Sequence, residues 1–366
     1  MKFSCTKTHL ERAVTIAERF TGKNIALPVL SHILLEAEGN GLVVTATNLE
    51  HAVQFRIPAQ VARLGKACLP AKIFSSLLQT ISDDKVEGDG DKGNLEVRTG
   101  LRHSRVNGTN PEDFPIVPKI KGGDMFSVEG GGFSRALGRV LPAVSSSEFR
   151  PELAGVYFKI GRDSATIAAT DTFRLAEHTI QLAQERTGSP LGFIVPFRAA
   201  HEINRVIEGE EGLVSVSLSE NQLLIEAGAG KIVSRLIEGN FPEYQSIIPS
   251  SFATSAYIPK DDLVAGIRAA SIFSSKLQEV TIRISSKQLE IASANSEVGE
   301  YRTKYPISAS GREAAMSFNW RYLLDGVQAI EDEDLFWGCN QEASPAMLRN
   351  KSNTAFTYVV MPIRIA

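Results

Sequence analysis

The sequence repeats one pattern three times, and this repetition limits the fold more than any other feature. A short extended segment that precedes a helical pattern occurs at residues 2–4, 125–127 and 256–258. The offsets are roughly 120 to 130 residues, about the length of one domain. A chain of 366 residues is also too long for one ordinary core. We therefore expect three similar domains, spanning residues 1–122, 123–250 and 251–366.

Each copy carries the same order of elements. Segments that follow an alternating apolar strand and open another recur at 45–48, 168–171 and 293–295. Second helices are predicted to begin near Pro70, Pro196 and Asn319. Runs of antiparallel strands with two helices per copy indicate an α+β fold, with the helices packed on antiparallel sheets.

Two glycine-rich segments, 87–91 and 227–230, are predicted to form the tips of β-hairpins. The first segment also has alternating acidic residues, as a calcium-binding loop does. It lacks the ligand spacing and the final glutamate of such a loop, so a hairpin is the favoured interpretation.

Composition excludes several classes of protein. The net charge of −3 and the absence of a basic block do not suggest a nucleic-acid-binding protein at first sight. Cys5, Cys68 and Cys339 are scattered, which fits neither a disulfide framework nor a zinc site, and we expect each to be buried in a reducing compartment. No apolar run is long enough to cross a bilayer, and no signal peptide opens the chain, so a cytoplasmic protein without membrane contact is expected.

The helical segments place basic residues opposite their apolar stripes. The first helix is predicted to begin with a capping box at 8–11 and to bury Leu10, Ala13, Val14 and Ala17. The second is predicted to bury Ile73, Phe74, Leu77 and Leu78. The sixth is predicted to bury Trp320, Leu323, Leu324 and Val327, with Asp325 outside. The basic residues predicted to be exposed on or next to the first five helices are Arg12, Arg19, Lys23, Lys72, Arg135, Arg139, Arg198, Arg205 and Arg268.

A charged outer face is ordinary for any single helix. Its recurrence on five helices in equivalent positions favours a shared basic surface, while acidic residues concentrate elsewhere, as at 331–334. Such a surface suits contact with DNA phosphates without the reading of bases.

Three motifs carry a resemblance to a known family. They are Ala-Thr-Asp-Thr-Phe-Arg-Leu-Ala at 169–176, Gly-Asn-Phe-Pro-Glu-Tyr at 239–244, and Tyr-Val-Val-Met-Pro-Ile-Arg at 358–364, with a weaker fourth at 317–322. With the repeat phasing, they make the chain resemble, over essentially its whole length, the bacterial DNA sliding clamp, which is the beta subunit of DNA polymerase III. The resemblance implies a non-catalytic processivity factor. It would encircle double-stranded DNA as a head-to-tail homodimer, with six domains around a hole lined by helices.

The resemblance also implies a hydrophobic peptide pocket between the second and third domains. Through it the clamp would hold the polymerase III alpha subunit, the clamp loader and repair proteins that carry a clamp-binding motif. The matching positions are Leu153, Thr170, Thr172, Phe173, Arg174, Leu175, Pro242, Ile247, Asn319, Tyr322, Val359, Met361, Pro362, Ile363 and Arg364. The chain departs from the family at Thr172-Phe173, where Gly-His is usual, and at Ser246, where an arginine is common. These departures concern partner preference.

For the dimer, the resemblance implies that Val106 and its neighbours face Ile272 and Phe273 of the other copy. The alternative is that Ile272 and Phe273 belong to the core of the third domain. The apolar C-terminal segment 359–363 has two interpretations as well. It lines the peptide pocket, or it only completes the sheet of the third domain.

No catalytic constellation competes with this interpretation. His201-Glu202 begins like a zinc-protease motif, but Arg205 stands where the second histidine is needed. The serines at 145–147 lack a nearby lysine, and no glycine-rich phosphate loop occurs. We therefore predict no catalysis, no cofactor and no metal. A ring-shaped scaffold that does not bind DNA, and a hydrolase or transferase with an unrecognised site, are the alternatives.

Overall fold

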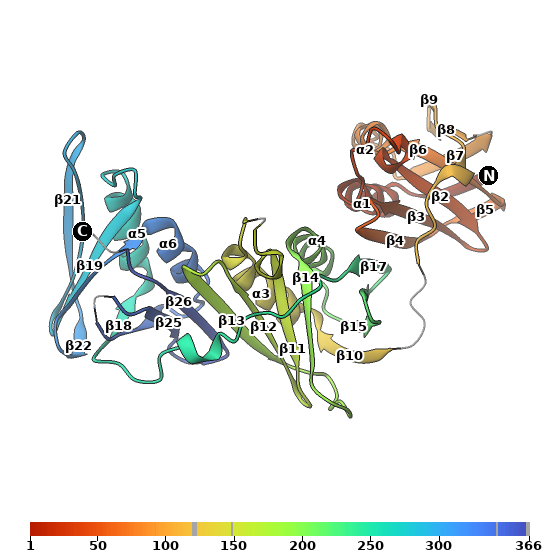
Figure 1. The fold of residues 1–366 in the computed structure, drawn as a ribbon. Coiled ribbons are helices and arrows are strands. Elements are labelled where there is room, and N and C mark those ends of the chain that lie inside the picture. Colours follow the sequence, from red (N-terminus) through yellow and green to blue (C-terminus); the bar gives the residue numbers. More distant parts are fainter. Residues whose placement is uncertain (92, 119–122, 148, 342, 364–366) are drawn as a thin grey trace. The chain divides into compact units, whose positions relative to one another are not determined.

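The computed structural model describes residues 1–91, 93–118, 123–147, 149–341 and 343–363 (Figure 1). This part of the chain contains six α-helices and four antiparallel sheets, which confirms the predicted α+β fold. The helices are α1 (Lys7–Arg19), α2 (Ala71–Gln79), α3 (Gly130–Val140), α4 (Phe197–Ile207), α5 (Lys260–Ser271) and α6 (Trp320–Gln328). The extended segments that open the three copies are the strands β1 (Lys2–Thr6), β10 (Asp124–Glu129) and β18 (Thr254–Pro259).

The chain forms two compact units. Unit 1 consists of residues 1–134, 182–185 and 198–236, and unit 2 of residues 135–181, 186–197 and 237–366. This division runs through the middle domain, so the expected borders after residues 122 and 250 stay predictions.

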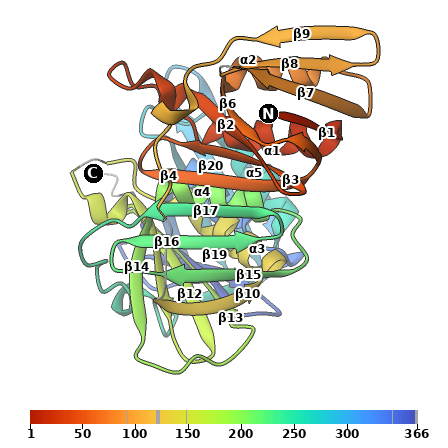
Figure 2. The ribbon, with the colours of Figure 1, turned by 90° about the vertical axis from the view of Figure 1, so that its right-hand side faces the viewer.

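Unit 1 contains two sheets. The five-stranded sheet has the order β5 (Gln60–Arg63), β1, β7 (Lys85–Asp91), β8 (Asn94–Thr99) and β9 (Arg102–Val106). The eight-stranded sheet has the order β10, β15 (Leu213–Leu218), β16 (Gln222–Ala227), β17 (Gly230–Arg235), β4 (His51–Pro58), β3 (Gly41–Thr47), β2 (His32–Glu38) and β6 (Gly65–Pro70). Antiparallel pairing of β17 with β4 joins strands of the middle and first domains in one sheet (Figure 2).

Unit 2 is built in the same way. Its nine-stranded sheet has the order β14 (Leu191–Pro196), β11 (Gly155–Ile160), β12 (Ser164–Thr170), β13 (Arg174–Gln181), β26 (Phe356–Val360), β25 (Ala346–Asn350), β24 (Asp334–Cys339), β18 and β22 (Ser308–Gly311). Its four-stranded sheet has the order β21 (Gly299–Pro306), β20 (Gln288–Asn295), β19 (Glu279–Ser285) and β23 (Ala314–Asn319). The last strand, β26, lies between β13 of the middle domain and β25 of the third (Figure 1).

The core follows the periodicity of the sequence. In α1 the buried residues are Leu10, Ala13, Val14 and Ala17, as predicted. In unit 2, Phe318 and Trp337 meet edge to face with ring centroids 5.6 Å apart. Gly326 of α6 lets this helix approach β26 closely, because a Cβ atom there would lie 2.3 Å from Cδ1 of Tyr358. Cys5, Cys68 and Cys339 are buried and free, and burial raises the pKa of each thiol, that of Cys5 to about 12.

The predicted start of the first helix is wrong by two residues, because a capping box at 8–11 makes Thr8 the N-cap residue. Helix α1 begins at Lys7, and its N-cap residue is Thr6, which makes no side-chain capping bond. Glu11, the acidic member of the predicted capping box, instead forms an ion pair of 2.7 Å with Lys7. A pair of opposite charges four residues apart stabilises a helix modestly, but it leaves the first backbone N–H groups of α1 without a side-chain cap.

One of the two predicted hairpin tips is also wrong. Residues 87–91 belong to strand β7, and their glycines face large side chains. A Cβ atom at Gly88 would lie 2.3 Å from Cε1 of Phe3, and one at Gly90 would lie 2.6 Å from Cγ of Met1. These glycines therefore serve close packing within a sheet. The tip at 227–230 is confirmed, with Gly228 at a φ of +51° between β16 and β17.

The buried faces of two short helices differ from the prediction. In α2 the inward side consists of Ala71, Phe74, Ser75 and Leu78, while Ile73 is exposed and Leu77 half-buried. In α6, Leu323 and Val327 are buried as predicted, but Trp320 and Leu324 are only half-buried. Helices of nine residues make few turns, so a small error in the direction of the inward face changes which residues are buried.

Candidate functional site

The first and middle domains share a turn that is repeated bond for bond. In the middle domain, Thr170 Oγ1 donates to the carbonyl oxygen of Arg174 (2.7 Å) and accepts from the Thr172 N–H (3.1 Å). Asp171 Oδ1 accepts from the backbone N–H groups of Phe173 and Arg174, each at 2.9 Å. Such side-chain bonds hold a turn without help from distant residues.

The first domain forms the same bonds with Thr47, Asn48 and His51. The third residue of each turn, Leu49 or Thr172, has the same positive φ of 76°. The internal repeat therefore extends to individual hydrogen bonds. In the middle domain this turn leads into β13, the strand that pairs with β26.

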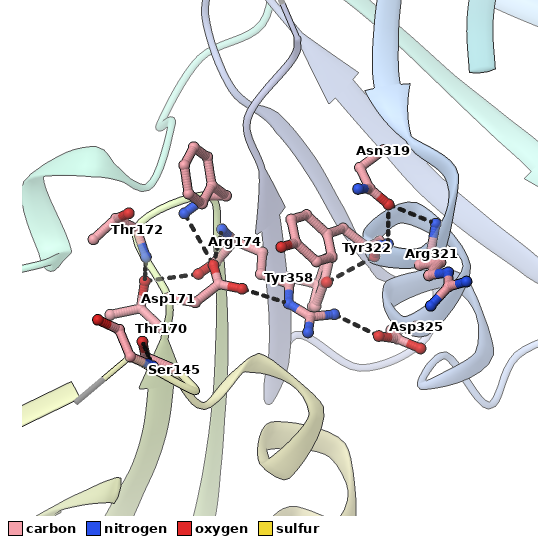
Figure 3. A network of polar contacts seen from close by, with 12 residues as sticks. Ser145, Thr170, Asp171, Thr172, Arg174, Asn319, Arg321, Tyr322, Asp325 and Tyr358 are labelled. Carbon is pink, nitrogen blue, oxygen red and sulfur yellow. Dashed lines mark hydrogen bonds and ion pairs between the residues drawn. The ribbon is translucent and has the colours of Figure 1, made fainter. Parts of the chain in front are cut away.

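Arg174 stands at the centre of a polar network that joins the turn to α6 (Figure 3). Its Nε donates to Asp171 Oδ2 (3.0 Å), and its Nη1 donates to Asp325 Oδ2 in a close contact. The guanidinium carbon lies 4.2 Å from the ring centroid of Tyr322, and the side chain is only 10% exposed. Burial alone would lower the pKa of Arg174, but Tyr358, Asp325 and Asp171 raise it, so the group is a permanent cation.

Three of the apolar side chains predicted for the peptide pocket are exposed. Phe173 is 59% exposed, Ile247 51% and Met361 38%. The Met361 N–H donates to the carbonyl oxygen of Phe173 (2.8 Å), and the Phe173 ring lies 6.5 Å from that of Tyr322. The chain after β26 is therefore fixed to the turn, and a second bond runs from the Ile363 N–H to Ser317 O (2.7 Å).

The residues predicted for the peptide pocket fall into three groups by exposure. Those buried are Leu153, Thr170, Leu175 and Val359, and those half-buried are Arg174, Pro242, Asn319, Tyr322, Pro362 and Ile363. Those exposed are Thr172, Phe173, Ile247 and Met361, and Arg364 lies outside the described residues. Leu175 and Val359 belong to one core cluster with Tyr244 and Met347. Their side chains therefore pack in the core of unit 2 and are not exposed to a peptide.

Sequence reasoning missed three members of the network. Asp171 and Tyr358 stood inside the quoted motifs but were not assigned a role, and Asp325 was expected only to point outward. Asp325 is instead an ion-pair partner of Arg174, 151 residues earlier in the chain. No local pattern carries such a pairing, because it depends on how α6 packs against β26, the strand that pairs with β13.

Arg139 is not the freely exposed cation that the helix period predicted. Its side chain is 11% exposed and forms an ion pair with Glu331, and its guanidinium carbon lies 5.4 Å from the centroid of the Phe356 ring. His178, which is also buried, contacts the same ring. Burial, and then the charge of Arg139, lower the pKa of His178 to about 4, so this histidine is neutral near pH 7.

The other predicted basic residues are exposed. In unit 1 they are Arg12, Arg19, Lys23, Lys72, Arg198 and Arg205, and in unit 2 they are Arg135 and Arg268. Lys23 lies beyond the end of α1, and Arg205 forms an ion pair of 3.5 Å with Glu202.

The residues predicted for the dimer contact lie at or near sheet edges. Val106 ends β9, an edge strand of the five-stranded sheet, and its side chain is buried within unit 1. Ile272 follows α5 and is 69% exposed. Phe273 is half-buried and stacks on Tyr301 of β21, the edge strand of the four-stranded sheet, with centroids 6.2 Å apart.

Among the described residues, no group of three or more His, Cys, Asp or Glu side chains could hold a metal ion. None of the helices that the structure describes is long and apolar enough to cross a membrane.

Comparison with known proteins gives one consistent result. Family models of the DNA polymerase III beta subunit match the chain in order: the N-terminal domain at residues 1–118, the central domain at 127–243 and the C-terminal domain at 245–364. A beta sliding clamp of Synechocystis sp. (strain PCC 6803) is 28% identical over 389 residues, with 100% of both chains covered. A DnaN sliding clamp of Pseudomonas aeruginosa, crystallised with griselimycin, matches with a TM-score of 0.95 and 25% identity over 100% of both chains. The beta subunit of Thermotoga maritima shares the fold, with a TM-score of 0.93 at 22% identity over 100% of both chains.

Proposed function

Because the chain belongs to the family of DNA polymerase III beta subunits, the bacterial sliding clamps, we propose that two copies close head to tail around duplex DNA and hold replication proteins there. Proteins of this family are non-catalytic processivity factors. Topological linkage needs only a closed ring, and the energy for loading can come from the ATP of a partner.

The observation that carries the proposal is the exposure of Phe173, Ile247 and Met361, three apolar side chains of the predicted pocket. These side chains are exposed although the backbone that bears two of them is fixed by the bond from Met361 N–H to Phe173 O. Exposed apolar side chains that are held in place mark a binding surface. Met361 also suits several partners, because methionine adapts its shape.

We propose that the ligand is a short peptide with a glutamine and spaced leucine or phenylalanine anchors. The polymerase III alpha subunit, the clamp loader and repair proteins would use the site in turn, in the cytoplasm. The pairing of β26 with both β13 and β25 supports this proposal, because the strand does more than complete the sheet of the third domain.

The basic residues on the helices would contact DNA phosphates loosely. Arg12, Arg19, Lys72, Arg198 and Arg205 are exposed in unit 1, which supports this role. Arg139 would contribute less than expected, because Glu331 neutralises it. A sliding ring should not read bases, so its direct affinity for DNA should be weak and strongly dependent on salt.

The edges of two sheets support a head-to-tail dimer. β9 of the first domain and β21 of the third domain are both edge strands, with backbone groups free to pair on one side. We propose that they meet across the subunit boundary near Val106, Ile272 and Phe273. A head-to-tail contact of this kind must close into a ring to avoid a filament.

Deletion of residues 361–366 tests the peptide site. β26 ends at Val360, so the deletion leaves the paired strand intact and removes only the segment fixed to Phe173. We expect the affinity for a fluorescent peptide with a glutamine, a leucine and a phenylalanine to fall at least ~30-fold in anisotropy, because one apolar anchor contributes about 2 kcal/mol.

The mass of the dimer by light scattering should stay the same, and this control separates loss of the site from loss of the fold. Unchanged peptide affinity in the shortened chain would show that the site lies elsewhere.

A further inference from the structure

A groove of about 860 Å³ lies on the eight-stranded sheet of unit 1. Side chains of β2, β3, β4, β6, β16 and β17 form its floor, and residues 111–118, which follow β9, form one wall. Every residue that lines it belongs to unit 1. Sites that bind small ligands have volumes of roughly 300–1,000 Å³. The groove is therefore large enough for a ligand, and it is separate from the predicted peptide pocket, whose residues lie in unit 2.

The internal repeat shows which part of unit 2 this groove matches. Leu34 of β2 and Tyr157 of β11 occupy equivalent places, as the pairing of their strands with β6 and β14 shows. Phe114 belongs to one core cluster with Leu34, and Phe241 stacks on Tyr157 with ring centroids 4.7 Å apart. Each phenylalanine is followed by a proline. The Phe-Pro pairs of the two segments therefore lie over equivalent strands.

The two segments differ two residues after the proline. In unit 2 this residue is Tyr244, which is 5% exposed and whose hydroxyl donates to Glu177 Oε2 (2.6 Å). In unit 1 it is Val117. Gln54 of β4 has the position of Glu177, because each lies three residues after the end of the repeated turn. A valine is smaller than a tyrosine and has no hydroxyl, so it replaces neither the volume nor the hydrogen bond of Tyr244.

The side chains beneath Tyr244 are buried, whereas their equivalents in unit 1 line the groove. Tyr244 belongs to one core cluster with Met347 and Val359. Leu224 and Val233 have the equivalent positions, since they pair across β16 and β17 as Met347 and Val359 pair across β25 and β26. Both are half-buried and line the groove. The groove is thus the place of an aromatic side chain that residues 111–118 do not supply.

The charges around the groove compensate one another. Its lining contains three basic and three acidic residues. Each basic residue forms an ion pair: Lys66 with Glu36, Arg56 with Glu38, and Lys231 with Glu226. An uncharged ligand leaves these pairs intact, whereas a charged one must compete with them and lose its own water. Charge complementarity therefore favours a neutral ligand.

We propose that this groove is a second ligand site, which binds a tyrosine side chain that a partner protein presents within an uncharged, apolar segment. The ring covers Leu224 and Val233 as Tyr244 covers its own cluster, and the hydroxyl bonds to the amide of Gln54. This amide is half-buried and donates a long bond of 3.4 Å to Thr45 Oγ1. An amide can either donate to a phenol oxygen or accept from its hydroxyl, so it suits this ligand.

The probe is a fluorescent, end-blocked peptide with the sequence Gly-Asn-Phe-Pro-Gln-Tyr-Gln. It copies residues 239–245, with glutamine in place of the glutamate so that the peptide is neutral. Anisotropy titration of the full-length protein should show saturable binding. A peptide with alanine in place of the tyrosine should bind at least ~10-fold more weakly, because a buried aromatic anchor carries much of the affinity of such a contact.

Two variants of the protein place the site in the groove. Leu224→Glu puts a carboxylate on the floor and should weaken binding at least ~10-fold, since a buried charge is costly. Leu213→Glu is the matched control, because Leu213 is an exposed leucine of the neighbouring strand β15, outside the groove, and its affinity should stay the same. Val117→Tyr supplies a tyrosine from the chain itself. It should weaken peptide binding and raise the urea midpoint of unfolding, a combination that damage to the fold does not produce.

Deletion of residues 361–366 separates this site from the peptide site in unit 2, and it should leave the affinity for the tyrosine peptide unchanged. A loss of affinity on this deletion would place the tyrosine peptide in unit 2 and overturn the inference. So would the absence of saturable binding, or wild-type affinity in Leu224→Glu or in Val117→Tyr. None of these results depends on whether the glutamine-containing peptide of the proposed function binds.

Discussion

At the scale of single residues, Thr172 combines a departure from the family pattern with an unfavourable backbone. The family usually has glycine there, and in this chain the φ of Thr172 is +76°. A side chain with a branched Cβ is disfavoured in this region, at a cost of about 1–2 kcal/mol. The turn holds the conformation through the bonds of Thr170 and Asp171.

Replacing Thr172 with glycine should therefore stabilise the protein by about 0.5–1 kcal/mol, since relief of strain exceeds the entropy that glycine adds to the unfolded chain. The midpoint of urea unfolding, followed by circular dichroism, measures this change. Leu49→Gly is the matched control, because Leu49 occupies the same place in the first domain with the same φ. A variant Thr172→Gly that unfolds at a lower urea concentration than the wild type would contradict this account.

At the scale of elements, local periodicity predicted those features that depend on one segment of the chain. It failed for features that depend on contacts with distant segments. The stripe of α1 and the hairpin tip at Gly228 follow from neighbouring residues, and both are confirmed. In the strand at 87–91, Gly88 and Gly90 leave room for the side chains of Phe3 and Met1, which lie on β1 or beside it. The sequence alone does not show these contacts, so the glycines were interpreted as a turn. Arg139 was misjudged for the same reason, since Glu331 and Phe356 lie far along the chain.

The candidate sites show the same division. The motifs located the turn of Thr170, Asp171 and Arg174, whose hydrogen bonds are local. They could not reveal that Asp325 completes the charge balance of Arg174, because that contact needs the packed structure. The family resemblance gave the residues of the predicted pocket, and the structure gave the exposure of each of them.

The edge of the third domain gives a prediction at this scale. Replacing Ile272 and Phe273 together with alanine should yield a monomer near the chain mass of 39.8 kDa by light scattering at micromolar concentration. Ile272 is exposed and Phe273 stacks on edge strand β21, so the change removes apolar contacts that are worth about 2 kcal/mol each at the centre of an interface.

Leu213→Ala is a suitable control, since Leu213 is 59% exposed and lies on β15, which is an inner strand of the eight-stranded sheet. If the double variant kept the mass of a dimer, the proposed contact would be in the wrong place.

At the scale of the whole molecule, a net charge of −3 is combined with exposed basic residues on helices of both units. We expect such a protein to have little affinity for DNA as a simple ligand, because its total charge is repelled by phosphates. Stable association must then come from a closed ring, and the contacts with phosphate need only be weak enough to permit sliding. The central claim is thus topological.

Retention on circular DNA tests that claim most directly. Labelled protein is placed on a nicked circular plasmid with a clamp loader and ATP, and the DNA-bound fraction is isolated by gel filtration before and after one restriction cut. We predict that the protein stays with the circle at moderate salt, without preference for plasmid sequence, and leaves within minutes once the circle is linear. Equal retention on the circular and linear DNA would contradict the account.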